Sequence, residues 1–157
     1  QGKAGILGKK RPDSVLIWGV SDELALGARE AARELLNLNP DNLIAGGVDW
    51  TVEGLKAIAN GDLHFSLGGH FMEGGWAIIL INDFHNGIDF THEFGTTINL
   101  PLGEINRANV HKYLGILEAE RWKDIDFKTY SKFHNPELSH YNFSLQRILD
   151  DISQTPR

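Results

Sequence analysis

The chain has 157 residues, of which 41% are hydrophobic and 23% charged, a composition typical of one folded globular domain. Its net charge of −6 argues against nucleic acid as the main partner. It has no cysteine, which excludes disulfides, thiolate metal sites and a cysteine nucleophile, and no apolar run reaches the roughly 18 residues that a membrane helix needs.

The N-terminal part predicts a strand and then a helix. Residues 1–13 are basic and glycine-rich, and "KKRPD" is typical of a helix end or loop closed by Pro12. The apolar run Ser14–Gly19 is typical of a strand buried on both faces of a parallel sheet. A helix is expected from about Asp22 to Leu36, with Ser21 as its N-cap. Its expected inward face holds Leu24, Ala28, Ala31 and Leu35.

The middle of the chain repeats this order. Asn42–Val48 predicts a second apolar strand, and Thr51 is expected to cap a second helix that ends at Gly61. The inward residues of that helix are Val52, Leu55 and Ile58. Leu63–Gly69 alternates between apolar and polar residues, and a long amphipathic stretch from Phe71 to about His85 stops at an Asn-Gly pair.

The remaining third predicts one more strand and one more helix. Thr96–Pro101 is typical of a strand, and Asn109–Arg121 of a helix with Val110, Tyr113, Leu114 and Leu117 inward. The tail from Trp122 is polar and aromatic and is expected to pack as an irregular wrap. Strands that alternate with helices predict an α/β fold of three layers, a mostly parallel sheet flanked by helices.

Three of these strands end in polar or glycine-rich turns. The turns are Gly19–Asp22, Gly47–Trp50 and Gly68–His70. Ligands of open parallel sheets bind beyond the carboxyl ends of the strands, so the turns should gather at one ligand-binding edge. For Ser21 and Asp22, helix capping alone is a sufficient explanation. Asp49 is less well explained in that way, because Thr51 already serves as a cap.

Two segments, "SDELALGA" (21–28) and "IAGGVDWTVEGLKAIANGDLHFSL" (44–67), resemble the second half of type 1 periplasmic sugar-binding proteins. The family pattern there is Asn-Asp-x-x-Ala-x-Gly-Ala, then Gly-x-Asp, then a helix that ends at a glycine turn. The resemblance runs from about Pro12 to Gly87, and Glu104–Leu114 resembles the family's closing segment. The combination is specific, although each piece alone is weak.

The resemblance implies a sugar site at the predicted edge. In the family, the Asp of Gly-x-Asp hydrogen-bonds ligand hydroxyls, a role that falls on Asp49. Ser21 replaces the family's Asn, and Gly69 lies where Gln or Asn is frequent, with His70 as the expected substitute. Trp50 is a large ring on which a sugar could stack. The expected ligand-binding residues are Ser21, Asp22, Asp49, Trp50, Gly69 and His70; no catalytic residue, metal or cofactor is expected.

Full family members have two lobes, and the resemblance covers the second. It implies that residues 1–121 are the C-terminal part of a two-lobe solute-binding domain and that residues 122–157 are a wrapping tail. The helix at 71–86 would pack on the N-terminal lobe, which makes that lobe an expected partner. Gln1 also suggests a processed or trimmed chain, so a C-terminal fragment or one piece of a nicked protein is expected.

The expected function is capture of a sugar or sugar-like ligand between two lobes, in the periplasm, for ABC-type uptake through a membrane permease. Two alternatives share the fold: a periplasmic sensor subunit that regulates a membrane kinase, and the effector-binding domain of a lac-repressor-type transcription regulator. The acidic balance and the long aromatic tail favour a secreted protein.

The sequence gives little support to a catalytic site or to a metal site. The seven histidines include His85 and His92 in "DFHNGIDFTHE", but no His-Glu-x-x-His or equivalent spacing occurs. Ser21 follows no Gly-x-Ser-x-Gly elbow, and the Gly-Gly pairs lack the spacing of a dinucleotide fingerprint. We therefore expect a binding protein and not an enzyme.

Overall fold

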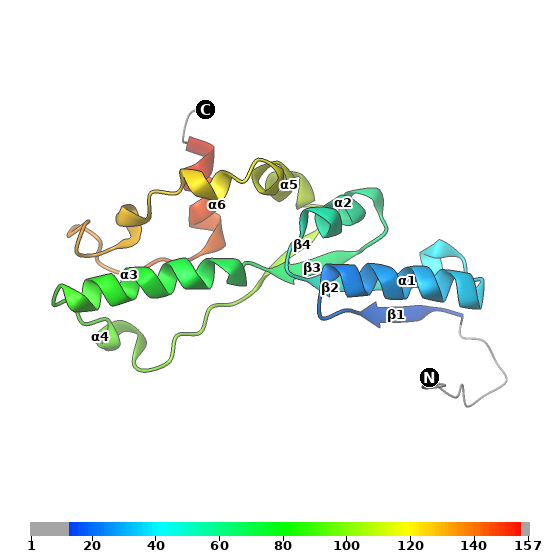
Figure 1. Cartoon of the computed structure of the whole chain (residues 1–157), viewed down its shortest axis with the longest axis horizontal. Coiled ribbons are helices and arrows are strands. Elements are labelled where there is room, and N and C mark those ends of the chain that lie inside the picture. Colours follow the sequence, from blue (N-terminus) through cyan, green and yellow to red (C-terminus); the bar gives the residue numbers. More distant parts are fainter. Residues whose placement is uncertain (1–12, 155–157) are drawn as a thin grey trace.

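The structure is a computed structural model that describes residues 13–154, so the loop predicted around Pro12 lies outside the described residues. Within that range four strands form one sheet in the order β1-β2-β3-β4. Their bounds are β1 (Val15–Trp18), β2 (Leu43–Val48), β3 (Phe65–Gly68) and β4 (Gly103–Asn106). The first three run parallel, and β4 runs antiparallel beside β3 (Figure 1). This confirms an α/β fold with a mostly parallel sheet flanked by helices.

The prediction of a strand at Thr96–Pro101 is wrong. That segment is irregular, and β4 begins beyond it. The apolar side chains Ile98 and Leu100 pack against a cluster on helix α3 (Glu73–His85) and not in the sheet. Tertiary packing of an alternating apolar segment has therefore replaced the hydrogen-bonded ladder that its pattern predicts.

Helix α1 (Asp22–Leu36) has the predicted bounds and the predicted cap, because the Ser21 hydroxyl accepts a hydrogen bond from Leu24 N at 3.3 Å. The predicted inward face is wrong. Leu24 and the other three residues of that face are exposed, whereas Ala25 is buried against the sheet. Gly19 explains why the Ala25 face is the buried one. A Cβ at Gly19 would lie 2.5 Å from Ala25 N, so the two backbones meet at this face.

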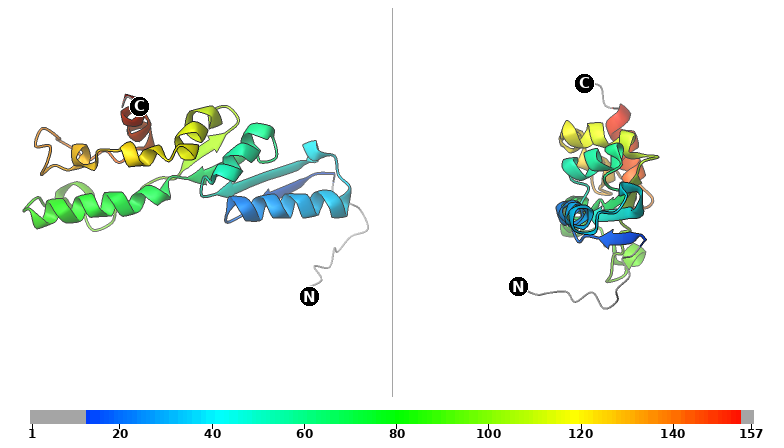
Figure 2. Two further views of the ribbon diagram at one scale, coloured as in Figure 1. Left: turned by 45° about the horizontal axis from the view of Figure 1, so that its top comes forward. Right: turned by 90° about the vertical axis from the view of Figure 1, so that its right-hand side faces the viewer.

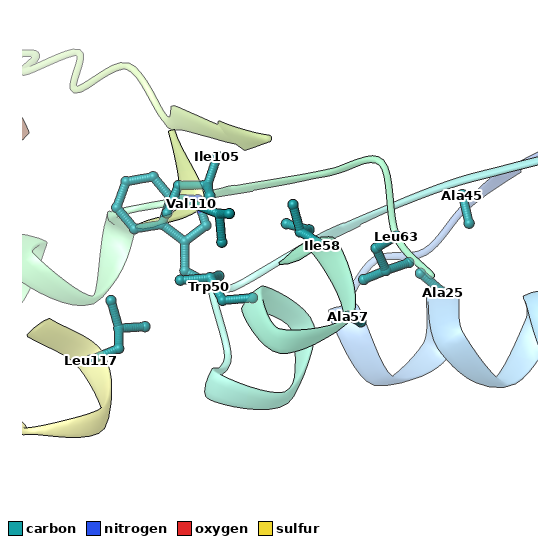
Figure 3. Packing of buried hydrophobic residues seen from close by; sticks show 10 residues of the cluster. Ala25, Ala45, Trp50, Ala57, Ile58, Leu63, Ile105, Val110 and Leu117 are labelled. Atoms are coloured by element: carbon teal, nitrogen blue, oxygen red, sulfur yellow. The ribbon is translucent and has the colours of Figure 1, made fainter. Parts of the chain in front are cut away.

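The remaining helices of the sheet region follow their predictions more closely. Helix α2 (Val52–Asn60) begins after Thr51, whose hydroxyl accepts from Gly54 N at 3.0 Å, and ends at Gly61 with a φ of 91°. Helix α5 (Val110–Glu118) is slightly shorter than expected but buries Val110 and Leu117 as predicted. Figure 3 shows side chains from α1, α2, α5, β2 and β4 meeting in one core on a single face of the sheet.

The opposite face of the sheet is not covered in the described part of the chain. Leu16 is 72% and Trp18 53% exposed, and Ile44 on the neighbouring strand is also exposed. The Trp18 ring lies against Phe65, with centroids 5.6 Å apart. The expectation that Ser14–Gly19 is buried on both faces is therefore wrong for the described residues, since α1, α2 and α5 pack on the other face.

A second core lies at the other end of the elongated molecule, where α3 runs beside the C-terminal segment (Figures 1 and 2). This segment contains the short helices η3 (Arg121–Asp124) and η4 (Phe127–Tyr130) and helix α6 (Leu145–Gln154). Trp76 stacks on Phe143 with centroids 4.8 Å apart. Short helices η1 (Pro40–Asn42), η2 (His70–Met72) and α4 (Thr91–Phe94) complete the described elements.

A buried carboxylate joins α3 to the C-terminal segment. Asp83 accepts hydrogen bonds from Lys132 N at 2.7 Å, from the Tyr141 hydroxyl at 2.8 Å and from the Ser131 hydroxyl. The hydrogen bonds hold the wrap in place over the buried face of α3. The opposite face of α3 remains exposed at Ile78, Ile81 and Phe84; packing of the helix on a further lobe stays a prediction.

Candidate functional site

The carboxyl ends of β1, β2 and β3 meet at one edge of the sheet. The parallel register pairs Trp18 with Gly46 and Val48 with Leu67. Backbone hydrogen bonds continue the pairing into the turns, from Gly19 N to Gly46 O at 2.9 Å and from Asp49 N to Leu67 O at 2.8 Å. The three polar turns singled out from the sequence therefore share the edge at which ligands of parallel sheets bind.

Asp22 lies beneath this edge and is fully buried. Its Oδ2 accepts from Thr51 N at 2.8 Å and from the Thr51 hydroxyl at 3.1 Å, and its Oδ1 accepts from the Ser66 hydroxyl at 2.6 Å. Burial raises the pKa of Asp22, and these hydrogen bonds only partly offset that rise. Asp22 ties the turns after β1 and β2 to β3 and has no surface to offer a ligand, which removes it from the expected site.

Trp50 is also part of the interior, with 2% of its surface exposed. Its indole Nε1 donates to Ser66 O at 3.1 Å, and its ring packs 5.1 Å from Tyr113. The ring lies so close to β3 and β4 that a Cβ at Gly68 or Gly103 would overlap it. Trp50 therefore anchors the turn from inside, and the expectation of an exposed stacking surface is wrong for this conformation.

Asp49 and His70 lie at the surface of the edge and contact each other. The distance from His70 Nε2 to Asp49 Oδ1 is 3.2 Å, and each side chain is 40% exposed. Asp49 has a φ of 104°, and Trp50 follows with a φ of 58°. Two consecutive non-glycine residues with positive φ are unusual, and such conformations concentrate at functional sites.

Gly69 contributes through its backbone. Its φ of 101° is one that a side chain rarely adopts, and a Cβ would lie 2.6 Å from Leu145 Cδ1. The glycine lets the chain turn from β3 into η2 directly over α6, and so it fixes where His70 begins. Ser21 lies on the same edge, partly exposed, with its hydroxyl engaged in the α1 cap.

A hollow adjoins His70 on the side of α3. It is lined by Glu73, Trp76, Leu100 and Phe143. The same four residues also line a second hollow along α3, of about 220 Å³, which His70 does not line. Glu73 was not expected from the sequence. Glu73 follows His70 by three residues in the first turns after β3, and this spacing could have predicted that the two lie close together.

The described residues contain no cluster of three or more His, Cys, Asp or Glu side chains able to hold a metal ion. Among the described helices, none combines the length and the apolarity required to cross a bilayer. The side chains of Asp49, His70 and Ser21 supply hydrogen-bond acceptors and donors at the edge.

No protein-family model matches the chain, and no curated protein sequence matches it. Solved structures do. A periplasmic sugar-binding protein from Pseudomonas fluorescens is 31% identical over 85% of this chain, with a TM-score of 0.69. The periplasmic binding component of an arabinose ABC transporter from Shewanella sp. ANA-3, bound to L-arabinofuranose, is 21% identical over 69% of the chain, with a TM-score of 0.55.

A protein from Mycobacterium smegmatis is 16% identical over 81% of the chain, with a TM-score of 0.51. The chain spans 41%, 35% and 39% of the lengths of these three structures. The first two are periplasmic binding proteins. The chain is therefore similar to part of periplasmic sugar-binding proteins with the type 1 fold.

Proposed function

We propose that the chain forms one wall of a sugar-binding cleft in a periplasmic solute-binding protein of the type 1 class, which delivers its ligand to an ABC-type permease. One observation carries the proposal. The exposed Asp49–His70 pair lies at the carboxyl edge of a parallel sheet whose fold matches sugar-binding proteins. Similarity to the arabinose-binding component supports the fold only.

The chemistry of the edge suits a polyhydroxylated ligand. A carboxylate accepts hydrogen bonds from neighbouring hydroxyl groups, and charge-assisted bonds of this kind are the stronger ones. His70 Nε2 lies 3.2 Å from Oδ1 of Asp49, and the half-exposed carboxylate is accessible to a ligand. Ser21 adds a hydroxyl on the same edge. In this proposal Trp50 and Asp22 hold the turns in place and do not touch the ligand.

The second wall of the cleft would come from another lobe. The exposed face of α3, with Ile78, Ile81 and Phe84, supports such a partner surface because apolar patches of this kind are normally covered. Closure of two lobes around the ligand would then be the signal that a membrane permease reads. With one wall alone, we expect millimolar or weaker sugar affinity.

The test is a titration of the ¹⁵N-labelled chain with D-ribose, L-arabinose, D-galactose and D-glucose at up to tens of millimolar, followed by NMR. We expect saturable shifts in the backbone signals of Asp49, Gly69 and His70, and loss of these shifts in Asp49→Ala. Asp41→Ala is the matched control, because Asp41 is an exposed carboxylate before β2, at the opposite edge. Shifts that survive in Asp49→Ala, or that map away from this edge, would contradict the proposal.

A further inference from the structure

The contact between Asp49 and His70 joins the turns that follow β2 and β3. Asp49 follows β2, whereas His70 opens η2 at the point where the chain leaves the sheet for α3. Nε2 of His70 lies 3.2 Å from Oδ1 of Asp49, within ion-pair contact. Both side chains are partly exposed, so the pair lies at the surface where a ligand would approach.

The backbone of Asp49 is fixed on one side by β3. Its N–H donates to Leu67 O at 2.8 Å, and the N–H of Trp50 donates to the Ser66 hydroxyl at 3.3 Å. These bonds hold two residues with positive φ in a conformation that isolated chain segments avoid. With the backbone held in this way, the Asp49 side chain retains its own rotation, and only a side-chain partner can fix the direction of the carboxylate.

His70 is fixed from its other side. Gly69 packs its backbone on Leu145 of α6, and Met72 N donates to Gly69 O at 3.1 Å. The backbone of His70 is therefore held in place, and its imidazole contacts Asp49 in the turn after β2. The other charged group that lines the hollow beside it is Glu73. The carboxylate of Asp22, below the edge, is occupied by Thr51 and Ser66.

The sequence gives His70 a special place at this edge. The three strand-end turns contain the acidic residues Asp22 and Asp49 but no Lys or Arg, and the acidic residues Glu23, Glu53 and Glu73 follow them closely. His70 is thus the sole side chain in these turns that can donate from a ring nitrogen to a carboxylate while keeping a second nitrogen free.

We propose that His70 is the positioning residue for Asp49: its Nε2–H donates to Asp49 Oδ1 and leaves Oδ2 directed at the ligand. The inference deepens the proposed function and rests on it for the nature of the ligand. It assigns His70 a role through Asp49 and not as a substitute for a ligand-binding amide. Removal of the donor should therefore weaken binding only when Asp49 is present.

The first arm of the test uses no sugar. Long-range ¹H–¹⁵N spectra of the full chain report which ring nitrogen of His70 carries the proton. We expect the Nε2–H form in the wild type and a clear change of the His70 ring signals in Asp49→Ala. Ring signals of His70 that are the same in both proteins would show that the pair does not form and would overturn the inference.

The second arm measures sugar affinity by the same NMR titration with the four monosaccharides. His70→Phe, which keeps a ring but loses the donor, should weaken binding by about tenfold, the effect of one lost hydrogen bond to a charged group. His70→Gln keeps an N–H at similar reach and should restore most of the affinity. In the Asp49→Asn background His70→Phe should have a much smaller effect, and His111→Phe, at an exposed position of α5, is the control.

The arms separate the two ideas. If no sugar binds the wild type but the His70 ring responds to Asp49→Ala, the sugar proposal fails while the positioning of Asp49 stands. If sugars bind and His70→Phe weakens them equally with and without the Asp49 carboxylate, the proposed function stands and the inference falls.

Discussion

The hydroxyl of Ser66 donates a hydrogen bond of 2.6 Å to the carboxylate of Asp22, 44 residues earlier in the chain. With the two bonds from Thr51, it makes Asp22 the point at which the ends of β1 and β2 are joined to β3. The close fit extends to the backbone, since a Cβ at Gly47 or Gly54 would overlap the Asp22 side chain. The geometry of the candidate edge therefore depends on a residue that no ligand can reach.

Asp22→Ala should lower the free energy of unfolding by about 2–4 kcal/mol, because buried donors of Ser66 and Thr51 lose their acceptor. Urea unfolding at pH 7 measures it. Glu23→Ala is the matched control, since Glu23 is the exposed acidic neighbour in the same first turn of α1, and it should change stability by less than about 1 kcal/mol. Equal losses in the two variants would show that the network around Asp22 contributes little.

The stability of the second core should fall in acid through Asp83. Burial opposes ionisation of this carboxyl, but hydrogen bonds from Ser131, Tyr141 and Lys132 outweigh burial and lower its pKa. A lowered pKa in the folded state contributes stability above the ordinary Asp value of about 4, and that contribution is lost as the pH falls through the folded-state pKa. The raised pKa of Asp22 acts in the opposite direction.

Asp83→Asn should therefore destabilise the chain at pH 7 and reduce the loss of stability below about pH 4. Thermal unfolding between pH 7 and pH 3 tests this expectation. Asp41→Asn serves as control and should leave the pH profile unchanged, because Asp41 is an exposed carboxyl of η1 outside the second core. A wild-type profile that Asp83→Asn leaves unchanged in shape would contradict the role of Asp83.

The local features of the fold could be predicted from the sequence. The structure confirms the predicted bounds of α1, its cap at Ser21 and the cap of α2 at Thr51. These features depend on residues that are neighbours in the sequence. The buried face of α1 could not be predicted, because both faces carry apolar residues. The choice depends on the approach of Gly19 to Ala25 and on the distant partners of Asp22.

The candidate site was predicted in part for the same reason. The apolar runs in the sequence predict parallel strands, and parallel strands bring their carboxyl ends to one edge. The structure places Asp49 and His70 together at that edge. The burial of Trp50 depends on glycines at 68 and 103 that give its ring room, and no local signal reveals that contact. Helix α6 was missed although its spacing of apolar residues, Leu145, Ile148, Leu149 and Ile152, was visible in the sequence.

Asp49→Gly should separate stability from binding. Glycine accepts the φ of 104° without strain, so the free energy of unfolding should stay the same or rise by about 1 kcal/mol. Sugar-induced NMR shifts should disappear, because the carboxylate is gone. Asn37→Gly, at the positive-φ C-cap of α1 and outside the strand-end turns, should leave the shifts intact. Large destabilisation by Asp49→Gly would mean that the side chain holds the turn and that strain is not the controlling factor.

The last prediction concerns association of the chain with itself. The C-terminal segment covers Trp76, Ile79 and Leu80 of α3, but Ile78, Ile81 and Phe84 on the other side remain exposed. A contiguous apolar stripe of this kind usually drives association. We expect the isolated chain to form dimers or larger species at micromolar concentration in light scattering, and Ile78→Glu with Ile81→Lys to shift it towards the monomer. Leu24→Glu with Leu35→Lys, on the exposed side of α1, is the matched control. A monomeric wild type would show that the exposed side of α3 needs no cover, and the support that this surface gives to a second lobe would be lost.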